Sequence, residues 1–103
     1  MSPKPLLALR LNPARARVGE EVEVRVEALF PAEGAVLRVG DLELPLAREG
    51  EGPPWVFAGR LTLRETLYRQ ATPLGRFLAL PVEVEAWQGG RKARALGRLL
   101  LLP

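Results

Sequence analysis

The strongest constraint on this chain is a strict alternation of apolar and charged side chains. In residues 21–28 every even position is apolar, and every odd position is charged. Successive side chains of a β-strand point to opposite faces, so this pattern predicts a strand with one buried and one wet face. Three more series share one parity: Leu7, Leu9 and Leu11; Trp55, Phe57, Leu61 and Leu63; and Leu78, Leu80, Val82, Val84 and Ala86. The chain is therefore predicted to be all-β.

Glycine and proline divide the alternating runs into about seven strands. We expect them near residues 5–12, 20–30, 35–39, 42–46, 55–63, 75–87 and 91–102. The best candidate for a helix, residues 63–70, is a single turn at most. Many short strands without helices indicate a sandwich or a barrel. Pro45 and Pro81 fall inside predicted strands, which places each at a sheet edge or a bulge.

The turn at Gly89-Gly90 predicts the register of the last hairpin. A two-residue turn of this kind places Trp87 opposite Lys92 and Glu85 opposite Arg94. The outer face would then carry a cation–π pair and a pair of opposite charges, and an opposite-charge pair across two strands stabilises by roughly 0.2–1 kcal/mol. A slip of one residue would move charges into the core, so the register is strongly specified.

A second turn at Gly40-Asp41 predicts another hairpin in the same way. It places Arg38 opposite Glu43 on the outer face and Leu37 opposite Leu44 on the inner face. Both hairpins thus keep charge on one face and apolar side chains on the other.

Two segments resemble bacterial immunoglobulin-like and fibronectin-type-III-like accessory domains. One is Pro13 followed by the Val-Gly-Glu-Glu-Val-Glu-Val-Arg-Val run of residues 18–26, and the other is the closing hairpin of residues 75–91. The resemblance implies one immunoglobulin-like antiparallel β-sandwich of about seven strands over residues 1–103, serving as a structural or adhesive module. The chain lacks a cysteine pair and a tryptophan in the third strand, so it departs from antibody-type domains and takes over no binding residues.

The residue types that carry most enzyme chemistry are scarce. The chain has no His and no Cys, which removes the commonest general base and the thiolate ligands. The carboxylate pairs Glu21/Glu23 and Glu83/Glu85 have strand spacing on predicted outer faces, where we expect solvation. With one Asp and one Asn, a calcium site lacks its usual oxygens. We therefore expect a non-enzyme without metal or cofactor.

The chain shows no targeting or membrane segment. Its first apolar run, residues 6–9, is too short for a signal peptide, and no run approaches the ~20 residues of a membrane span. We expect no membrane insertion and a cytoplasmic chain if it is a whole gene product, or an extracytoplasmic one if it belongs to an exported protein. Few Asn, Gln and Met residues among many charges also suit a thermophile.

Charge is distributed unevenly along the chain. Residues 1–19 and 91–103 each sum to +4, whereas residues 20–51 sum to −6. In an immunoglobulin-like sandwich the first and last strands are neighbours, so the two basic segments could form one basic edge. Such charges either protect a sheet edge from aggregation or dock an acidic protein surface or polyanion. Without stacking aromatics or a known motif, specific nucleic-acid binding is not expected.

These patterns predict a non-catalytic structural or protein-interaction module within a larger assembly. The docking residues would be Trp87, Arg91, Lys92 and Arg94, and the partner another protein with an acidic surface. Trp87 either covers the hairpin by stacking on Lys92 or serves as an exposed anchor. The alternative is a carbohydrate- or anion-binding module that uses Trp87 and the basic edge.

Overall fold

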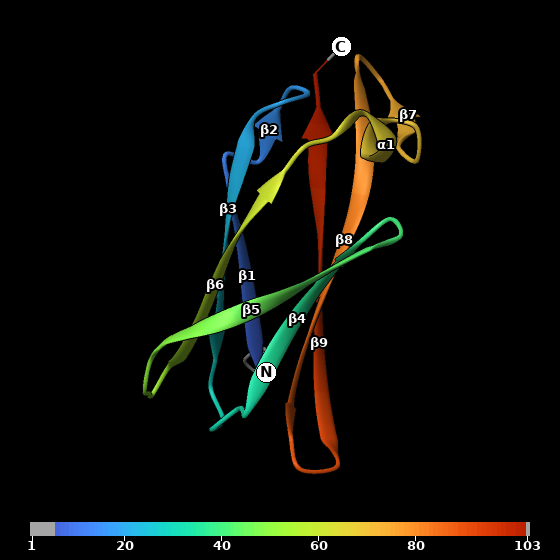
Figure 1. Cartoon of the computed structure of the whole chain (residues 1–103). Coiled ribbons are helices and arrows are strands. Elements are labelled where there is room, and N and C mark those ends of the chain that lie inside the picture. The colour runs from blue at the N-terminus through green and yellow to red at the C-terminus, as the bar shows by residue number, and fades with distance from the viewer. Residues whose placement is uncertain (1–5, 103) are drawn as a thin grey trace.

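The computed structural model describes residues 6–102, and that part of the chain contains nine strands and one helical turn (Figure 1). The all-β prediction is confirmed, as is the limit of one turn near residues 63–70. Pro5, the predicted start of the first strand, lies outside the described residues. The elements are β1 Leu7–Asn12, β2 Arg15–Ala16, β3 Glu21–Ala28, β4 Gly34–Val39, β5 Leu42–Gly50, β6 Trp55–Thr62, α1 Glu65–Tyr68, β7 Thr72–Leu74, β8 Phe77–Gln88 and β9 Arg91–Leu101.

Within the described residues the strands form one mixed sheet that is nearly closed into a barrel. The order is β1-β3-β6-β5-β4-β8-β9-β2, and β7 pairs with β8. Most pairs are antiparallel, whereas β2 runs parallel to β9. The first strand of this order approaches the next-to-last one, since a Cβ added at Gly97 of β9 would lie 2.9 Å from Cδ2 of Leu9 in β1. The predicted proximity of the first and last long strands is therefore confirmed.

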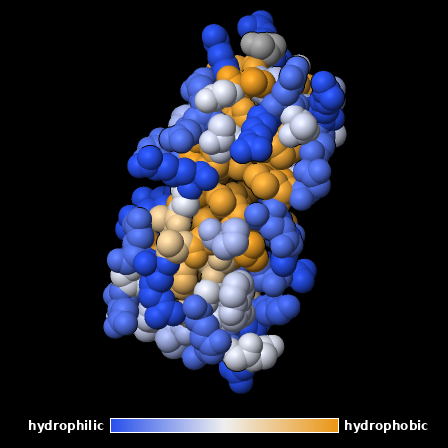
Figure 2. Space-filling model, in the orientation of Figure 1, coloured by the Kyte–Doolittle hydropathy of each residue, from blue (hydrophilic) through white to orange (hydrophobic). Residues whose placement is uncertain are grey.

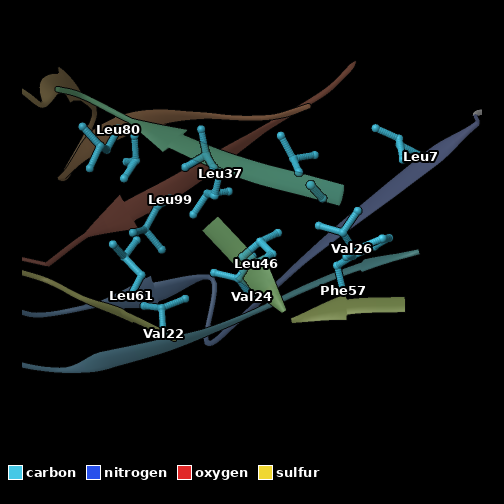
Figure 3. Packing of buried hydrophobic residues seen from close by; sticks show 14 of the residues in the cluster. Leu7, Val22, Val24, Val26, Leu37, Leu46, Phe57, Leu61, Leu80 and Leu99 are labelled. Carbon is cyan, nitrogen blue, oxygen red and sulfur yellow. The ribbon is translucent and has the colours of Figure 1, made fainter. Parts of the chain in front are cut away.

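The core fills the inside of this curled sheet. Along β3 the even positions are buried and the charged odd positions face outward, as the alternation predicts. Burying one such apolar side chain contributes about 1.5–3 kcal/mol. Phe57 is buried and Trp55 packs half-buried beside the core, which confirms their predicted inner position. Figure 3 shows side chains from several strands meeting in this core, among them Val22, Val24, Val26, Leu37, Phe57, Leu61, Leu80 and Leu99.

Two strands and one extension were not predicted. Strands β2 and β7 have two and three residues, too few for alternation to be visible. Strand β5 continues to Gly50 instead of ending at residue 46, because its second part, from Ala47 on, pairs with β6 and includes a register shift between Arg48 and Gly50. The predicted count of about seven strands is therefore too low.

Both prolines occupy local edge positions, as predicted. Pro81 lies in a gap on one side of β8, where pairing with β4 ends at Val82 and pairing with β7 begins at Ala79. Pro45 pairs with β4, but pairing of β5 with β6 begins only at Ala47. Each proline, which has no backbone N–H group, thus lies where no neighbouring strand would accept a hydrogen bond from it.

Candidate functional site

The candidate site is the outer face of the β8–β9 hairpin, and its register is the predicted one. The ladder sets Trp87 opposite Lys92 and Glu85 opposite Arg94. Gly89 in the turn has a φ of +59°, a left-handed conformation that favours glycine. The turn therefore fixes which side chains share the outer face.

Strands β4 and β5 extend this face on its other side. Arg38 of β4 lies opposite both Glu83 of β8 and Glu43 of β5, which confirms the register predicted from Gly40-Asp41. Gly34 lies opposite Trp87. Side chains from four strands therefore meet on one surface.

Glu85 contradicts the prediction of a solvated carboxylate, because it is only 4% exposed. Arg94 Nε donates a hydrogen bond to Glu85 Oε2 at 3.1 Å, and Arg38 Nη1 donates to the same oxygen at 3.4 Å. Lys92 Nζ lies 3.6 Å from Glu85 Oε1. The strand parity placed Glu85 on the correct face, but three long basic side chains cover it there.

Two further carboxylates join this cluster. Arg38 Nε donates to Glu43 Oε1 at 3.0 Å, and Glu83 Oε1 lies 3.5 Å from Arg94 Nε. The cluster of Arg38, Glu43, Glu83, Glu85, Lys92 and Arg94 thus alternates three cations with three carboxylates. The predicted basic edge is therefore not a bare positive surface at this hairpin.

The ion pairs of the cluster shift the pKa values of Glu85 and Arg38 toward their charged forms. Burial raises the pKa of Glu85, but the hydrogen bond from Arg94 and the charges of Lys92 and Arg38 together bring that pKa below the ordinary glutamate value. The hydrogen bond to Glu43, with the nearby Glu85, raises the pKa of Arg38 above its ordinary value. Glu85 therefore stays ionised at neutral pH beneath its cations.

Trp87 is half-buried, and its ring lies close to Gly34 of β4. A Cβ added at Gly34 would lie 2.5 Å from Cζ2 of Trp87, so the ring occupies the space above this glycine. The Trp87 carbonyl accepts a hydrogen bond from Glu33 N at 2.7 Å, and Glu33 Oε1 accepts one from Gly89 N at 2.9 Å. These bonds tie the segment before β4 to the hairpin turn.

The predicted stacking of Trp87 on Lys92 does not occur, because the Lys92 ammonium is directed to Glu85. The cation–π contact found in residues 6–102 is instead that of Arg48 over Phe57, with 5.7 Å between Cζ and the ring centroid. Trp87 and Lys92 both line a shallow depression of about 450 Å³, together with Arg38 and other side chains of this face.

The structure separates Arg91 from the other three predicted residues. Arg91 pairs with Gln88, whose parity in β8 is opposite to that of Trp87. It is exposed, has no ion pair among the described residues, and lines a second depression with Leu6, Phe30 and, at the rim between the two faces, Lys92. Trp87, Lys92 and Arg94 share one face, and Arg91 belongs to the other.

Sequence reasoning missed Arg38, Glu43, Glu83 and Glu85 as members of the site. The signal was present, since the two hairpin registers already paired Arg38 with Glu43 and Glu85 with Arg94. What sequence did not supply was the pairing of β4 with β8, which joins the two pairs into one cluster.

The described residues contain no group of three metal-ligating side chains. None of their helices is long and apolar enough to cross a membrane.

The comparisons with known proteins concern the fold alone. Neither a family model nor a curated protein matches the chain. Among solved structures, one neighbour is the endo-beta-1,4-mannanase from Thermotoga petrophila, with a TM-score of 0.64 and 16% identity over 97% of this chain and 20% of that chain. Another is the alkylpurine DNA glycosylase AlkC from Pseudomonas fluorescens bound to DNA with an abasic site analog, with a TM-score of 0.51 and 14% identity over 96% and 31%. The chain thus spans less than a third of either neighbour, and at these identities the likeness is one of fold.

Proposed function

We propose that this chain is a non-catalytic accessory module that binds another protein through the outer face of the β8–β9 hairpin, at Trp87, Lys92 and Arg94. Its fold would be an immunoglobulin-like sandwich. Strands β1, β3, β6 and the second part of β5 would form one layer, and β4, β8, β9, β2, β7 and the first part of β5 the other. The two sets of ladders into which the strands divide support this description.

The observation that carries the proposal is the buried Glu85 beneath three cations. Because Glu85 holds Arg38, Lys92 and Arg94 in fixed positions, a partner loses less side-chain freedom on binding. The Lys92 and Arg94 side chains still expose 61% and 65% of their surface, so each can reach a further carboxylate. A partner with an acidic surface fits this arrangement.

Trp87 supplies an apolar element beside these cations. Tryptophan is enriched among residues that dominate binding energy, and here its ring is held against Gly34. The neighbours' lengths agree with a module role, since the similar fold makes up a minor part of each larger chain.

A carbohydrate- or anion-binding module is the second candidate. The depression beside Trp87, Lys92 and Arg38 supports it, because an indole ring and fixed cations can hold a sugar or an anion. One of the structural neighbours is a mannanase, which makes mannan a reasonable first glycan to test.

The test is a capture experiment from source-cell lysate with three baits. One is the wild type, one carries Trp87→Ala and Lys92→Glu, and the matched control carries Arg91→Glu, which alters a cation on the opposite face. We expect one protein to be retained by the wild type and by Arg91→Glu and lost from the double variant. Circular dichroism confirms that each bait is folded.

The other outcomes assign the face differently. Equal retention by all three baits would rule out this hairpin face as the docking site. Saturable binding of a glycan or anion, lost only in the double variant, would favour the second candidate. Retention of nucleic acid alone, removed by moderate salt, would indicate a general polyanion surface.

A further inference from the structure

The second region of interest is the place where β5 separates from β6. The two strands pair only at Ala47 with Ala58, Arg48 with Phe57 and Gly50 with Val56. Strand β6 continues to Thr62 paired with β3, while the first part of β5 pairs with β4 instead. Figure 1 shows β5 crossing away from the upper part of β6. Beyond Ala58, therefore, no described strand pairs with this edge of β6.

The backbone of β6 offers unused hydrogen-bonding groups at this edge. Leu63 N donates to Glu20 O at 3.0 Å, and Leu63 O accepts from Gly19 N at 2.7 Å, so both groups of Leu63 point toward the β3 side. Alternate residues of an antiparallel strand direct their groups to the same neighbour. Arg60 and Thr62 therefore direct theirs the other way, into the space that β5 has left.

The facing edge of β5 is less suited to pairing. Ala47 pairs with Ala58 of β6, so Pro45, two residues earlier, directs its backbone toward the same open space. Proline has no N–H group to donate, and such residues protect exposed edges from added strands. An incoming strand would therefore pair with β6.

The floor of this opening is apolar. Leu42, Leu44, Leu61 and Leu67 line a groove of about 290 Å³ between β5, β6 and α1. Leu42 is 37% exposed, and Figure 2 shows hydrophobic side chains reaching the surface in the middle of this face. An incoming strand would cover these groups with every second side chain.

The rim of the groove is basic. The Arg60 side chain is 70% exposed, and its Nη1 lies 3.9 Å from the Glu21 carboxylate. Arg64 is exposed and has no ion pair among residues 6–102, whereas Asp41 accepts a hydrogen bond from Gln70 Nε2 at 3.1 Å. Arg60, Arg64 and Asp41 all line the groove, so its charged side chains sum to a net positive charge that favours an acidic strand.

We propose that this groove binds an extended peptide segment of alternating apolar and acidic residues, added as a strand to the Arg60–Thr62 edge of β6. An acidic residue opposite Arg60 would share its outer face, and an apolar residue opposite Leu61 would share its inner face. Main-chain bonds to Arg60 and Thr62 supply affinity, and the alternating side chains supply selectivity. This site is separate from the proposed hairpin face and stands independently of it.

The test uses a capped eight-residue peptide that alternates valine and glutamate, and a twin that alternates valine and lysine. Each is titrated into the labelled full chain and followed by amide chemical shifts and hydrogen exchange. We expect saturable binding of the acidic peptide with protection of the Arg60 and Thr62 amides, and at least tenfold weaker binding of its basic twin.

Three variants separate backbone pairing from charge. Thr62→Pro removes a donor at the β6 edge and should abolish binding, while Arg60→Glu should weaken the acidic peptide about tenfold and favour the basic twin. Arg10→Glu, which alters an exposed cation on β1, is the control and should bind as the wild type does. If Thr62→Pro does not fold, the peptide affinities of Arg60→Glu and the hydrogen-exchange protection of wild type still test whether the peptide binds at this edge. Equal binding of both peptides, protection elsewhere, no saturation, or dimerisation through this edge without peptide would overturn the proposal.

Discussion

The β8–β9 hairpin and the β5–β6 opening show opposite uses of a sheet. The hairpin ladder is continuous from Leu78 opposite Leu101 to Gln88 opposite Arg91, so the backbone groups that β8 and β9 direct toward each other are used, and the candidate site on this hairpin consists of side chains. The β5–β6 ladder has three pairs, so backbone groups of β6 remain for another strand. At the hairpin, a partner would contact side chains. At the β5–β6 opening, it would bond to backbone groups.

The largest expected effects are losses of unfolding free energy when a buried leucine is shortened, and they compare the core at the two regions. Leu37→Ala removes a fully buried side chain of β4, flanked by β5 and β8, and Leu61→Ala removes a buried one at the groove. Such changes cost about 2–5 kcal/mol, less where the site can collapse or admit water. We expect Leu37→Ala near the top of this range and Leu61→Ala near the bottom, measured by urea unfolding. Equal losses would show that the groove is packed as tightly as the closed side.

The next effect concerns the position of Trp87. Gly34→Ala places a methyl group 2.5 Å from the ring, and overpacking of this kind costs about 1–3 kcal/mol. In a Trp55→Phe background the fluorescence of Trp87 should change with it. Gly90→Ala, where an added Cβ meets nothing within 4 Å, is the control. An unshifted spectrum in Gly34→Ala would mean that the ring is not held against β4.

A smaller effect tests the buried carboxylate through pH. Because the pKa of Glu85 is lowered in the folded chain, its ionised form stabilises the fold above the ordinary glutamate pKa, and this contribution disappears as pH falls through the folded-state value. The stability advantage of wild type over Glu85→Gln should therefore shrink between pH 7 and pH values below about 4.3. The corresponding difference for Glu23→Gln, an exposed residue without an ion pair among those described, should be smaller. If the stability advantage of wild type over Glu85→Gln did not change with pH, the ion pairs of Glu85 would not stabilise the fold.

The smallest change in stability is expected at the edge of β5. Pro45→Thr restores an N–H donor there and should alter the free energy of unfolding by less than about 1 kcal/mol. Its main consequence should be self-association, since the protected edge becomes able to pair. Sedimentation velocity over a range of concentrations measures this, and a monomer at all concentrations would show that Pro45 does not protect the edge.

The same contrast explains what could be predicted from sequence. The register at Trp87 and Lys92 followed from a two-residue turn, because local turn geometry leaves one pairing that keeps charge out of the core. The burial of Glu85 did not follow, since it requires Arg38 to arrive from β4, far away in the chain. Likewise, no local pattern reveals that β5 changes partners near Ala47, because an alternating strand looks the same beside either neighbour.

The parallel pairing of β2 with β9 has a mechanical consequence. Leu100 N donates to Ala14 O at 3.0 Å and Leu102 N donates to Ala16 O at 2.9 Å, close to the end of β9. Strand β1 begins in the lower half of the molecule, away from the end of β9 at the top, as Figure 1 shows. Tension applied between these ends would load the two bonds in shear, so that they must rupture together. The short strand β2 thus resists extension of the chain in addition to the long ladder between β8 and β9.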